Sequence, residues 1–470
     1  MSHYLAIDCG LTNIKASVFD KNGQALSLAQ AQTPVEGERI AIDVLTDNLF
    51  TVVKQAVQQA GQPISRIAIS GHGNGLYYLL QDGTVCGLSS MANAPTPDDP
   101  ELIRLTKQSI WGGQPLALLK RIKNEDRDTY NRIVKFMFCK DFLVYLLSGF
   151  VSTDYSDASA AALLNAETSQ YSPDILRLHG LMDAMNKLPT LYRSSNTSAF
   201  VNAEAAARTG LAEGTPICAG MFDVNACILG AGAYEDSYQL IAGTWGINAV
   251  ITHDLTDCPS VTQSCLFLSP HTHMLIDSAP VSCVNLEWLM TRLFPQYTYA
   301  DANQLVSQTP IDPNLFYLPY LYPPMDIPQA RGGFIGLRPH HTSGDMIRAV
   351  MEAVVFEHRR RIDKFRNADI VRPRAVLSGG AAKSELWCQM FADVLQIPVE
   401  QTGHDQAGLL GCAILCAVAN KDYACVADAV AGMSKPRRIF TPKSDMYQAK
   451  YHNFIKEITP WITTLQERKS

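Results

Sequence analysis

Asp223 is a carboxylate in an otherwise small and apolar stretch, AGMFDVNACILGAG, residues 219–232. An unpaired carboxylate is costly in apolar surroundings, so such a residue is normally paired, bound to a metal or protonated. The structural alternative is a helix cap, because aspartate is common where helices start. The sequence therefore leaves two interpretations of Asp223 open, a reactive carboxylate and a cap, and it assigns no role to Asn225.

A second aspartate, Asp8, ends the apolar run YLAID and opens the turn DCGLTNIK. Thr12, Asn13 and Lys15 follow it and offer a hydroxyl, an amide and an ammonium group, which can donate hydrogen bonds to phosphate oxygens. A carboxylate beside such donors can orient a hydrated Mg²⁺ ion. The alternative role for Asp8 is to stabilise the turn through its own backbone.

A comparable glycine turn, Gly243-Thr244-Trp245-Gly246, follows the apolar run YQLIA. Glycines in such turns let backbone N–H groups approach an anion closely, although a plain tight hairpin is the alternative. Trp245 either covers bound phosphates or packs against the protein. The sequence has no GxxxxGK[ST], HRD or DFG motif, so it favours two separate phosphate turns over a P-loop or a protein kinase.

The two turns belong to a repeated plan. Matching positions recur at a constant offset, namely Gly10 and Gly243, Ile14 and Ile247, and Ala16 and Ala249. In each half a helix-like run (43–60 and 345–366) then precedes a strand ending in Ser-Gly (RIAISG and RAVLSG). Two likenesses in the same order indicate an internal duplication. We expect an α/β protein with domains at 1–235 and 236–470 and a ligand cleft between them.

The bulk composition is that of an ordinary soluble protein, with 47% hydrophobic residues and a net charge of -6 over 470 residues. We expect the basic run His358–Arg361 to be a solvated helix face and not a nucleic-acid site. The 12 cysteines form no CxxC pair, which predicts reduced, mostly buried thiols. Histidine spacing supports no metal site. Neither a secretory signal nor a membrane span is evident, so the sequence predicts a cytoplasmic protein.

Four longer segments resemble the FGGY carbohydrate kinases along the whole chain. They are GGFIGLRPHHTSGDMIRAVMEA (332–353), LSGGAAKSELWCQMFADVL (377–395), KDFL (140–143) and STDYSDAS (152–159). The resemblance implies two duplicated actin-like and hexokinase-like (ribonuclease H-like) ATPase domains with an interlobe cleft. The run IWGGQPLALLKRIKNEDRDTY and the segments GNGLYYL and MFDV look closest to the L-xylulose kinase branch.

The resemblance also implies roles for individual residues. Asp223 aligns with the family's catalytic base, Asp8 and Thr12 with the first phosphate motif, and Gly243 and Thr244 with the second. With the donors noted above, the expected ATP-binding residues are Thr12, Asn13, Lys15, Gly243, Thr244, Gly379, Gly380, Ala381 and Ser384, with Gln389 nearby. Mg²⁺ is expected at Asp8 and Asp223, and the sugar at Gly73, Asn74, Asn93 and Asp223.

The chain departs from the family pattern at the sugar site. Where many members carry an acidic residue, this chain has LSSMANAPT with Met91 and Asn93, and Leu118 stands where many relatives have a lysine. A hairpin turn is the alternative for Gly73 and Asn74. For Lys140 and Asp141, an ion pair at a helix start is favoured over contact with substrate.

We therefore expect an ATP- and Mg²⁺-dependent kinase for a terminal primary hydroxyl of a small sugar, a ketopentose such as L-xylulose. Other ketoses or polyols, such as ribulose, D-xylulose, erythritol or glycerol, remain alternatives. A non-catalytic nucleotide-dependent sensor of the same fold is a further alternative, against which Asp223 argues. No nucleic-acid or membrane partner is expected, and the resemblance implies a possible homodimer.

Overall fold

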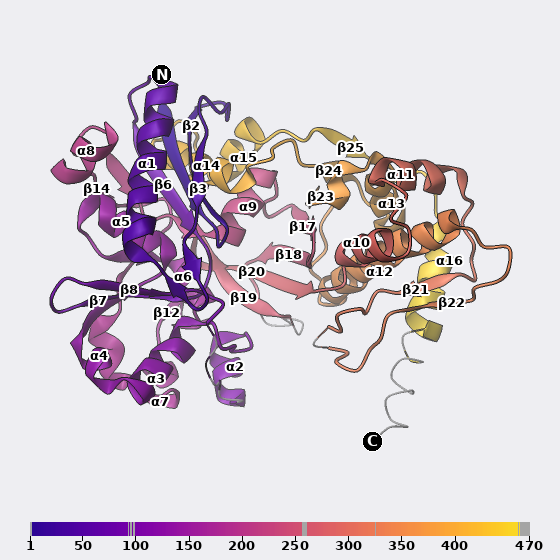
Figure 1. Ribbon diagram of the computed structural model, residues 1–470, viewed down its shortest axis with the longest axis horizontal. Helices are drawn as coiled ribbons and strands as arrows, with labels where there is room; N and C mark the ends of the chain where they lie inside the picture. The colour runs from indigo at the N-terminus through magenta and orange to yellow at the C-terminus, as the bar shows by residue number, and fades with distance from the viewer. Residues whose placement is uncertain are drawn as a thin grey trace.

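Two seven-stranded sheets, one in each half of the chain, form the centre of the computed structural model (Figure 1). The structure describes residues 2–458, apart from 93, 95, 97, 98, 256–260 and 325, together with residue 460. The first sheet has the order β14 (Thr197–Phe200), β15 (Pro216–Cys218), β6 (Arg66–Gly71), β1 (His3–Cys9), β2 (Asn13–Asp20) and β3 (Ala29–Gln32), with β16 (Met221–Phe222) beside β6. The second has the order β19 (Gln263–Phe267), β20 (Ser269–Ala279), β18 (Gly246–Thr252), β17 (Ser237–Ala242), β23 (Arg374–Ser378), β24 (Val399–Gln401) and β25 (Arg438–Phe440).

The pairing of the central strands confirms the predicted duplication. β1 is antiparallel to β2 and parallel to β6, and β17 is likewise antiparallel to β18 and parallel to β23. The prediction that residue numbers in the two hairpins differ by the same amount throughout is wrong, because this difference changes by one residue across the turn. The last paired residues are Cys9 and Ile14 in the first hairpin but Ala242 and Gly246 in the second, so the second turn is one residue shorter.

The two predicted helices are present as α1 (Ile42–Ala60) and α12 (Ser343–Asn367). α1 buries one face, including Leu45, Leu49 and Val53, against the first sheet. The expectation that His358–Arg361 forms a solvated face is wrong for its two end residues, because His358 and Arg361 are each only 2% exposed. Arg361 can be buried because the carboxylate of Asp277 on β20 neutralises it at 2.6 Å.

The expected sugar loop connects the first sheet to a smaller, five-stranded sheet. Its order is β4 (Val35–Glu36), β5 (Arg39–Ile40), β8 (Val85–Leu88), β7 (Leu76–Leu80) and β9 (Ile133–Met137). β6 and β7 belong to different sheets, so the segment GHGNG between them is not a hairpin turn. The loop instead carries the chain from the end of a central strand into a second layer.

Two helices, one from each half of the chain, pack backbone against backbone. α9 (Asp223–Ala231) lies against α14 (Ala407–Ala419) with glycines at the contact. A Cβ atom on Gly411 would come within 2.0 Å of the Ala226 carbonyl oxygen, and one on Gly230 within 1.8 Å of the Ala407 oxygen. α14 also packs on β1, so this late segment returns to the first half, as Figure 1 shows for the yellow helices α14 and α15 (Val426–Met433).

The proline-rich stretch at 318–334 is an excursion within the second half, as predicted. It connects β21 (Phe316–Leu318) to β22 (Gly333–Ile335), which pair with each other in an antiparallel manner. Among the residues that the structure describes, every cysteine is free and only Cys425 is exposed. None of the described helices is long and apolar enough to span a membrane.

Gly411→Ala tests the contact between α9 and α14. We expect a loss of about 3 kcal/mol or more in the free energy of unfolding, since the added methyl group meets backbone that cannot rotate away. Urea unfolding measures this loss. Gly333→Ala is the matched control, because a Cβ there has no neighbour within 4 Å. Equal stability of the two variants would contradict the close packing of the helices.

Candidate active site

Asp223 begins α9 directly after the end of β16 and faces the expected sugar loop. Its Oδ2 accepts a hydrogen bond from the Gly73 N–H at 3.4 Å, and its Oδ1 accepts one from the Val224 N–H at 2.7 Å. Phe222 takes the cap position of α9, and Asp223 is the first helical residue, where its carboxylate satisfies one backbone N–H of the first turn. Burial and the negative charge of Asp8 raise the pKa of Asp223 to about 7.

Asp8 lies on β1, two strands away from β16 in the first sheet. Its Oδ1 accepts a hydrogen bond from the Ser70 hydroxyl at 2.6 Å, and burial raises its pKa despite that bond and the nearby Lys15 ammonium. Gly408 at the start of α14 leaves room for it, because a Cβ there would lie 2.6 Å from Asp8 Oδ2. Two carboxylates with raised pKa values that repel each other suit a divalent cation, whose preferred ligands are carboxylate oxygens.

The turn after β1 brings the expected phosphate donors together. Thr12 is exposed, while Asn13 and Lys15 are partly buried. The Lys15 ammonium donates to the side-chain oxygen of Gln406 at 2.9 Å, and Lys15 pairs with Asp8 across the hairpin. Gln406 immediately precedes α14, so a residue near the end of the chain holds the lysine of the first turn. Sequence reasoning did not identify Gln406, and no motif marks it.

The second turn exposes one hydroxyl to solvent, and its Gly243 N–H donates to the Trp245 carbonyl at 3.2 Å. Thr244 is exposed, and Trp245 is 52% exposed, so its ring does not pack into the core. Gly379 lies against the same turn with a φ of 89°, and a Cβ there would come within 2.6 Å of the Ala242 carbonyl oxygen. The glycine ends of β17 and β23 therefore meet at one edge of the second sheet.

A cavity of about 430 Å³ opens beside this edge. It contains Gly380 and Ser384, whose hydroxyl donates to the Asn303 side-chain oxygen at 2.7 Å. Ala381 is buried next to Gly380.

Gln389, expected near the adenosine, is not among the residues that line this cavity. Its side-chain amide instead donates to Asp393 on α13 (Glu385–Leu395) and to the Thr441 carbonyl. The other lining residues come mainly from α10 (Val284–Arg292) and α11 (Tyr299–Gln308), and include Cys283, Glu287, Tyr299 and Asn303.

Sequence reasoning missed those α10 and α11 residues because no glycine turn accompanies them. Their only signal is an amphipathic helical pattern, which is typical of any packed helix. The cavity has apolar walls with a few polar groups, as small-molecule sites usually do.

The loop at Gly73 and Asn74 lies at the other end of the site. Asn74 has a φ of 64°, and its buried Oδ1 has no hydrogen-bond partner among the residues that the structure describes. Gly73 packs against the Phe222 ring, and the Gly75 N–H donates to the Gly113 carbonyl at 2.9 Å. A buried polar atom without a partner is rare in proteins. The loop therefore holds an unsatisfied acceptor at Asn74, next in sequence to the Gly73 N–H that donates to Asp223.

The neighbouring segment LSSMANAPT, residues 88–96, contains no acidic residue. Met91 is 68% exposed, and Asn93, expected to contact the sugar, lies outside the described residues. Leu118, which replaces the family's lysine, is buried within α3 (Pro115–Glu125). An apolar residue is the expected occupant of such a position.

Lys140 and Asp141 form a buried ion pair and not a substrate contact. The Lys140 ammonium lies 2.5 Å from Asp141 Oδ1 and 3.2 Å from carboxylate oxygens of both Asp154 and Asp157. Both residues of the pair are completely buried at the start of α5 (Cys139–Ser148). This agrees with the helix-start ion pair that the sequence favoured.

In the part of the chain that the structure describes, one group of three side chains, Asp312, His340 and His341, has metal-ligating atoms close together. His341 Nδ1 accepts a hydrogen bond from the Arg338 N–H at 3.0 Å, so Nε2 carries the proton and donates to Asp312 at 2.9 Å. The ring then has no free lone pair for a metal.

Family models match both halves of the chain. The FGGY family of carbohydrate kinases matches with its N-terminal domain at residues 94–230 and with its C-terminal domain at 240–420. A probable L-xylulose kinase of Haemophilus influenzae is 28% identical over 97% of this chain and 99% of its own. The L-xylulose/3-keto-L-gulonate kinase of Escherichia coli is 29% identical over 96% of both chains.

A solved structure shows the same fold. Xylulose kinase from Rhodospirillum rubrum superposes with a TM-score of 0.90 at 22% identity and covers 99% of both chains. This agrees with the predicted α/β architecture of two actin-like ATPase domains. Carbohydrate kinases of this family use ATP, typically with a divalent metal ion, and phosphorylate a small sugar. The chain belongs to the FGGY family of carbohydrate kinases and is a sugar kinase.

Proposed function

We propose that the protein transfers the terminal phosphoryl group of ATP to a primary hydroxyl of a ketopentose such as L-xylulose, with Mg²⁺ as the metal. The observation that carries this proposal is the position of Asp223. It lies beside Asp8 and the first phosphate turn, and it accepts a hydrogen bond from Gly73 in the loop expected to hold the sugar.

Asp223 is the proposed general base. A catalytic base works best when its pKa lies near the working pH, and burial and Asp8 bring Asp223 to about 7. Its carboxylate would accept the proton of the sugar hydroxyl as that oxygen attacks phosphorus. Mg²⁺ held by Asp8 and Asp223 would neutralise phosphate charge and lower the repulsion between the two acids.

The remaining residues would bind and orient the substrates. We assign Thr12, Asn13 and Lys15 to one end of the phosphate chain and Gly243 and Thr244 to the other. The adenosine would lie in the cavity at Gly380 and Ser384, against Gly379 and Ala381. Asn74, with its unpartnered oxygen, and Gly73 would contact the sugar, as would Asn93. The lobes 1–235 and 236–470, a homodimer and a cytoplasmic location remain predictions.

The chemistry of the sugar loops supports a neutral substrate. The relatives are named for L-xylulose and for 3-keto-L-gulonate, and the second of these carries a carboxylate. Segments 72–75, 88–92 and 110–114, which lie around Asn74 and Gly113, contain no lysine or arginine. A sugar acid would need such a partner for its charge, so we favour the neutral ketopentose.

A coupled ADP-release assay over a substrate panel tests the proposal. The panel holds L-xylulose, D-xylulose, ribulose, 3-keto-L-gulonate, erythritol and glycerol. We expect the highest kcat/KM with L-xylulose and at least tenfold less with the sugar acid. A preference for a polyol or for the sugar acid would overturn the substrate assignment. Sugar-independent ATP binding without turnover of any member would favour the sensor alternative.

Asp223→Asn tests the general base. We expect binding of ATP without metal to stay close to that of the wild type and kcat to fall about 10² to 10⁴-fold, because the amide cannot accept the proton. Steady-state kinetics and calorimetric binding of ATP measure the two effects. Asp43→Asn is the matched control, since Asp43 stands in the first turn of α1 but is exposed. Normal turnover by Asp223→Asn would refute the assignment.

The same variant should be more stable than the wild type at high pH when metal is removed by a chelator. The pKa of Asp223 is about 7 in the folded protein but near 4 when unfolded, so ionisation costs stability as pH rises through that window. Asparagine removes the cost. By urea unfolding we expect a gain of about 2 kcal/mol at pH 8 and little change at pH 4.5. A gain that does not depend on pH would show that ionisation is not the cause.

Gly380→Leu tests the adenosine site. Gly380 lines the cavity, and a Cβ there would lie 3.6 Å from Cys283 Sγ, so a longer side chain would fill the space beyond. We expect KM for ATP to rise about tenfold or more while KM for the sugar stays constant. An unchanged KM for ATP would place the adenosine elsewhere.

A further inference from the structure

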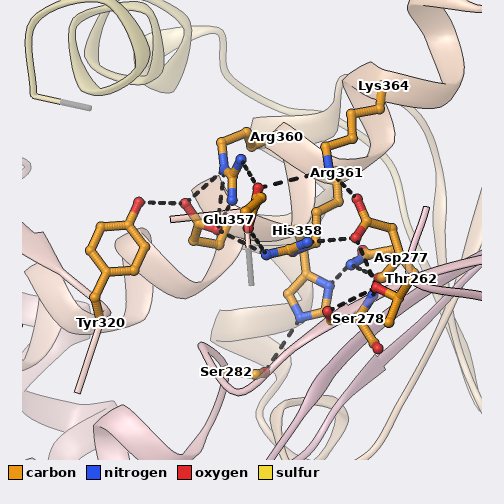
Figure 2. A network of polar contacts seen from close by, with 12 residues as sticks. Thr262, Asp277, Ser278, Ser282, Tyr320, Glu357, His358, Arg360, Arg361 and Lys364 are labelled. Carbon is orange, nitrogen blue, oxygen red and sulfur yellow. Dashed lines mark hydrogen bonds and ion pairs between the residues drawn. The ribbon is translucent and has the colours of Figure 1, made fainter. Parts of the chain in front are cut away.

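A buried polar network connects α12 to the second sheet (Figure 2). Arg361 Nη1 donates to Asp277 Oδ1 at 2.6 Å, and the Lys364 ammonium lies 2.7 Å from Asp277 Oδ2. Figure 2 shows the arginine and lysine reaching from the helix towards the aspartate on the strand. Two cations on successive turns of α12 therefore hold the helix against β20.

The network fixes the protonation state of His358. The Asn248 amide N–H donates to the Asp277 carbonyl at 3.3 Å, which points the Asn248 oxygen at His358 Nδ1, 2.7 Å away. Burial and the neighbouring Arg361 guanidinium lower the pKa of His358 to about 3, so the ring is neutral. With the proton on Nδ1, Nε2 is an acceptor and faces the Ser282 hydroxyl at 3.4 Å.

The His358 ring and Ser282 lie against the base of the second phosphate turn. A Cβ on Gly246 would come within 3.3 Å of His358 Nε2 and 3.2 Å of Ser282 Cβ. At the other end of the turn, the Gly243 carbonyl accepts a hydrogen bond from the N–H of Cys283 at 2.8 Å. Both ends of the turn are therefore in contact with the segment that the His358–Ser282 pair holds.

We propose that His358 is a positioning residue for the nucleotide phosphates. Through Ser282 and Gly246 it fixes the Gly243–Gly246 turn in the conformation that presents its N–H groups to ATP. The proposal rests on the proposed function, because it assumes that this turn binds phosphate. His358 is buried below the turn, so it acts through the backbone of the turn and not by touching the ligand.

The preorganised turn has a physical rationale. Backbone N–H groups bind an anion strongly only when they are already aligned, since ordering a glycine turn at the moment of binding costs conformational entropy. A neutral histidine provides the support without adding a charge below the turn. Removing the support should therefore weaken nucleotide binding and leave sugar binding unaffected.

Ser282→Ala and His358→Leu test the proposal by calorimetry with MgATP and by kinetics with the sugar that the panel identifies. We expect each variant to raise the Kd of MgATP about tenfold with an unchanged KM for the sugar. His358→Gln should weaken MgATP binding less than His358→Leu, because the glutamine amide oxygen can accept the hydrogen bond from the Ser282 hydroxyl in place of Nε2. An equal rise in the Kd of MgATP for His358→Gln and His358→Leu would contradict the proposal, because it would show that the size of the side chain and not its hydrogen bond to Ser282 supports nucleotide binding.

Tyr320→Phe is the matched control. It removes the hydrogen bond from Tyr320 to Glu357 at 2.9 Å, which belongs to the same network but lies away from Ser282 (Figure 2). We expect this variant to lower Tm yet keep the wild-type Kd. A wild-type Kd for Ser282→Ala, or an equal rise in Tyr320→Phe, would overturn the positioning role. If the wild-type protein binds no MgATP, the proposed function fails together with this inference.

Discussion

The backbone contact between α9 and α14 is the constraint on which the site depends. One helix carries Asp223 at its first residue, and the other begins at Ala407, next to Gln406 and Gly408. Because Gly230 and Gly411 allow the two backbones to touch, the start of α14 lies against the end of α9 and beside Asp8, whose Oδ2 a Cβ on Gly408 would approach within 2.6 Å. Asp8 and Lys15 of the first hairpin, Asp223 of α9 and Gln406 before α14 thus come from three separate parts of the chain. Larger side chains at the crossing would push α14 away from α9 and from the first hairpin, and would disturb the contact between Gln406 and Lys15.

Buried charge is used differently in the two halves. In the first half, the Lys140 ammonium lies within 3.2 Å of three carboxylates, those of Asp141, Asp154 and Asp157. Burial raises the pKa values of Asp8 and Asp223, in Asp8 despite the nearby Lys15 ammonium and in Asp223 with the charge of Asp8 as a second cause. In the second half, Arg361 and Lys364 pair with Asp277 and leave His358 neutral. Fully paired charges fix the positions of elements, whereas the two underpaired acids retain the capacity to react or to bind a cation.

Much of this architecture could be predicted from the sequence, because its signals are local. Strand–turn–strand patterns identified both hairpins, and amphipathic periodicity identified α1 and α12. The family segments identified the kinase fold. The burial of His358 and Arg361 could not be predicted, since a basic run on a helix normally faces solvent and the neutralising Asp277 is far away in sequence. Gln406, Asn303 and Glu287 were missed for the same reason, because only the tertiary fold brings them to the site. The one-residue difference in length between the two turns was not predicted, because an alignment of Gly10 with Gly243 does not show which residues of the two strands pair across each turn.

That shorter second turn breaks the symmetry of the duplicated sheets. By strand pairing with Ser70 and Ser378, the position of Asp8 in the first hairpin corresponds to Ile241 in the second. One hairpin thus combines an acid with a lysine, while its copy has only backbone and hydroxyl donors. In the proposed function, a nucleotide lying between the two hairpins would meet two chemically unlike ends, which would set its direction. The terminal phosphate and its metal would lie at the acidic hairpin and the base at the other, and reversed binding would leave the acids facing an uncharged purine.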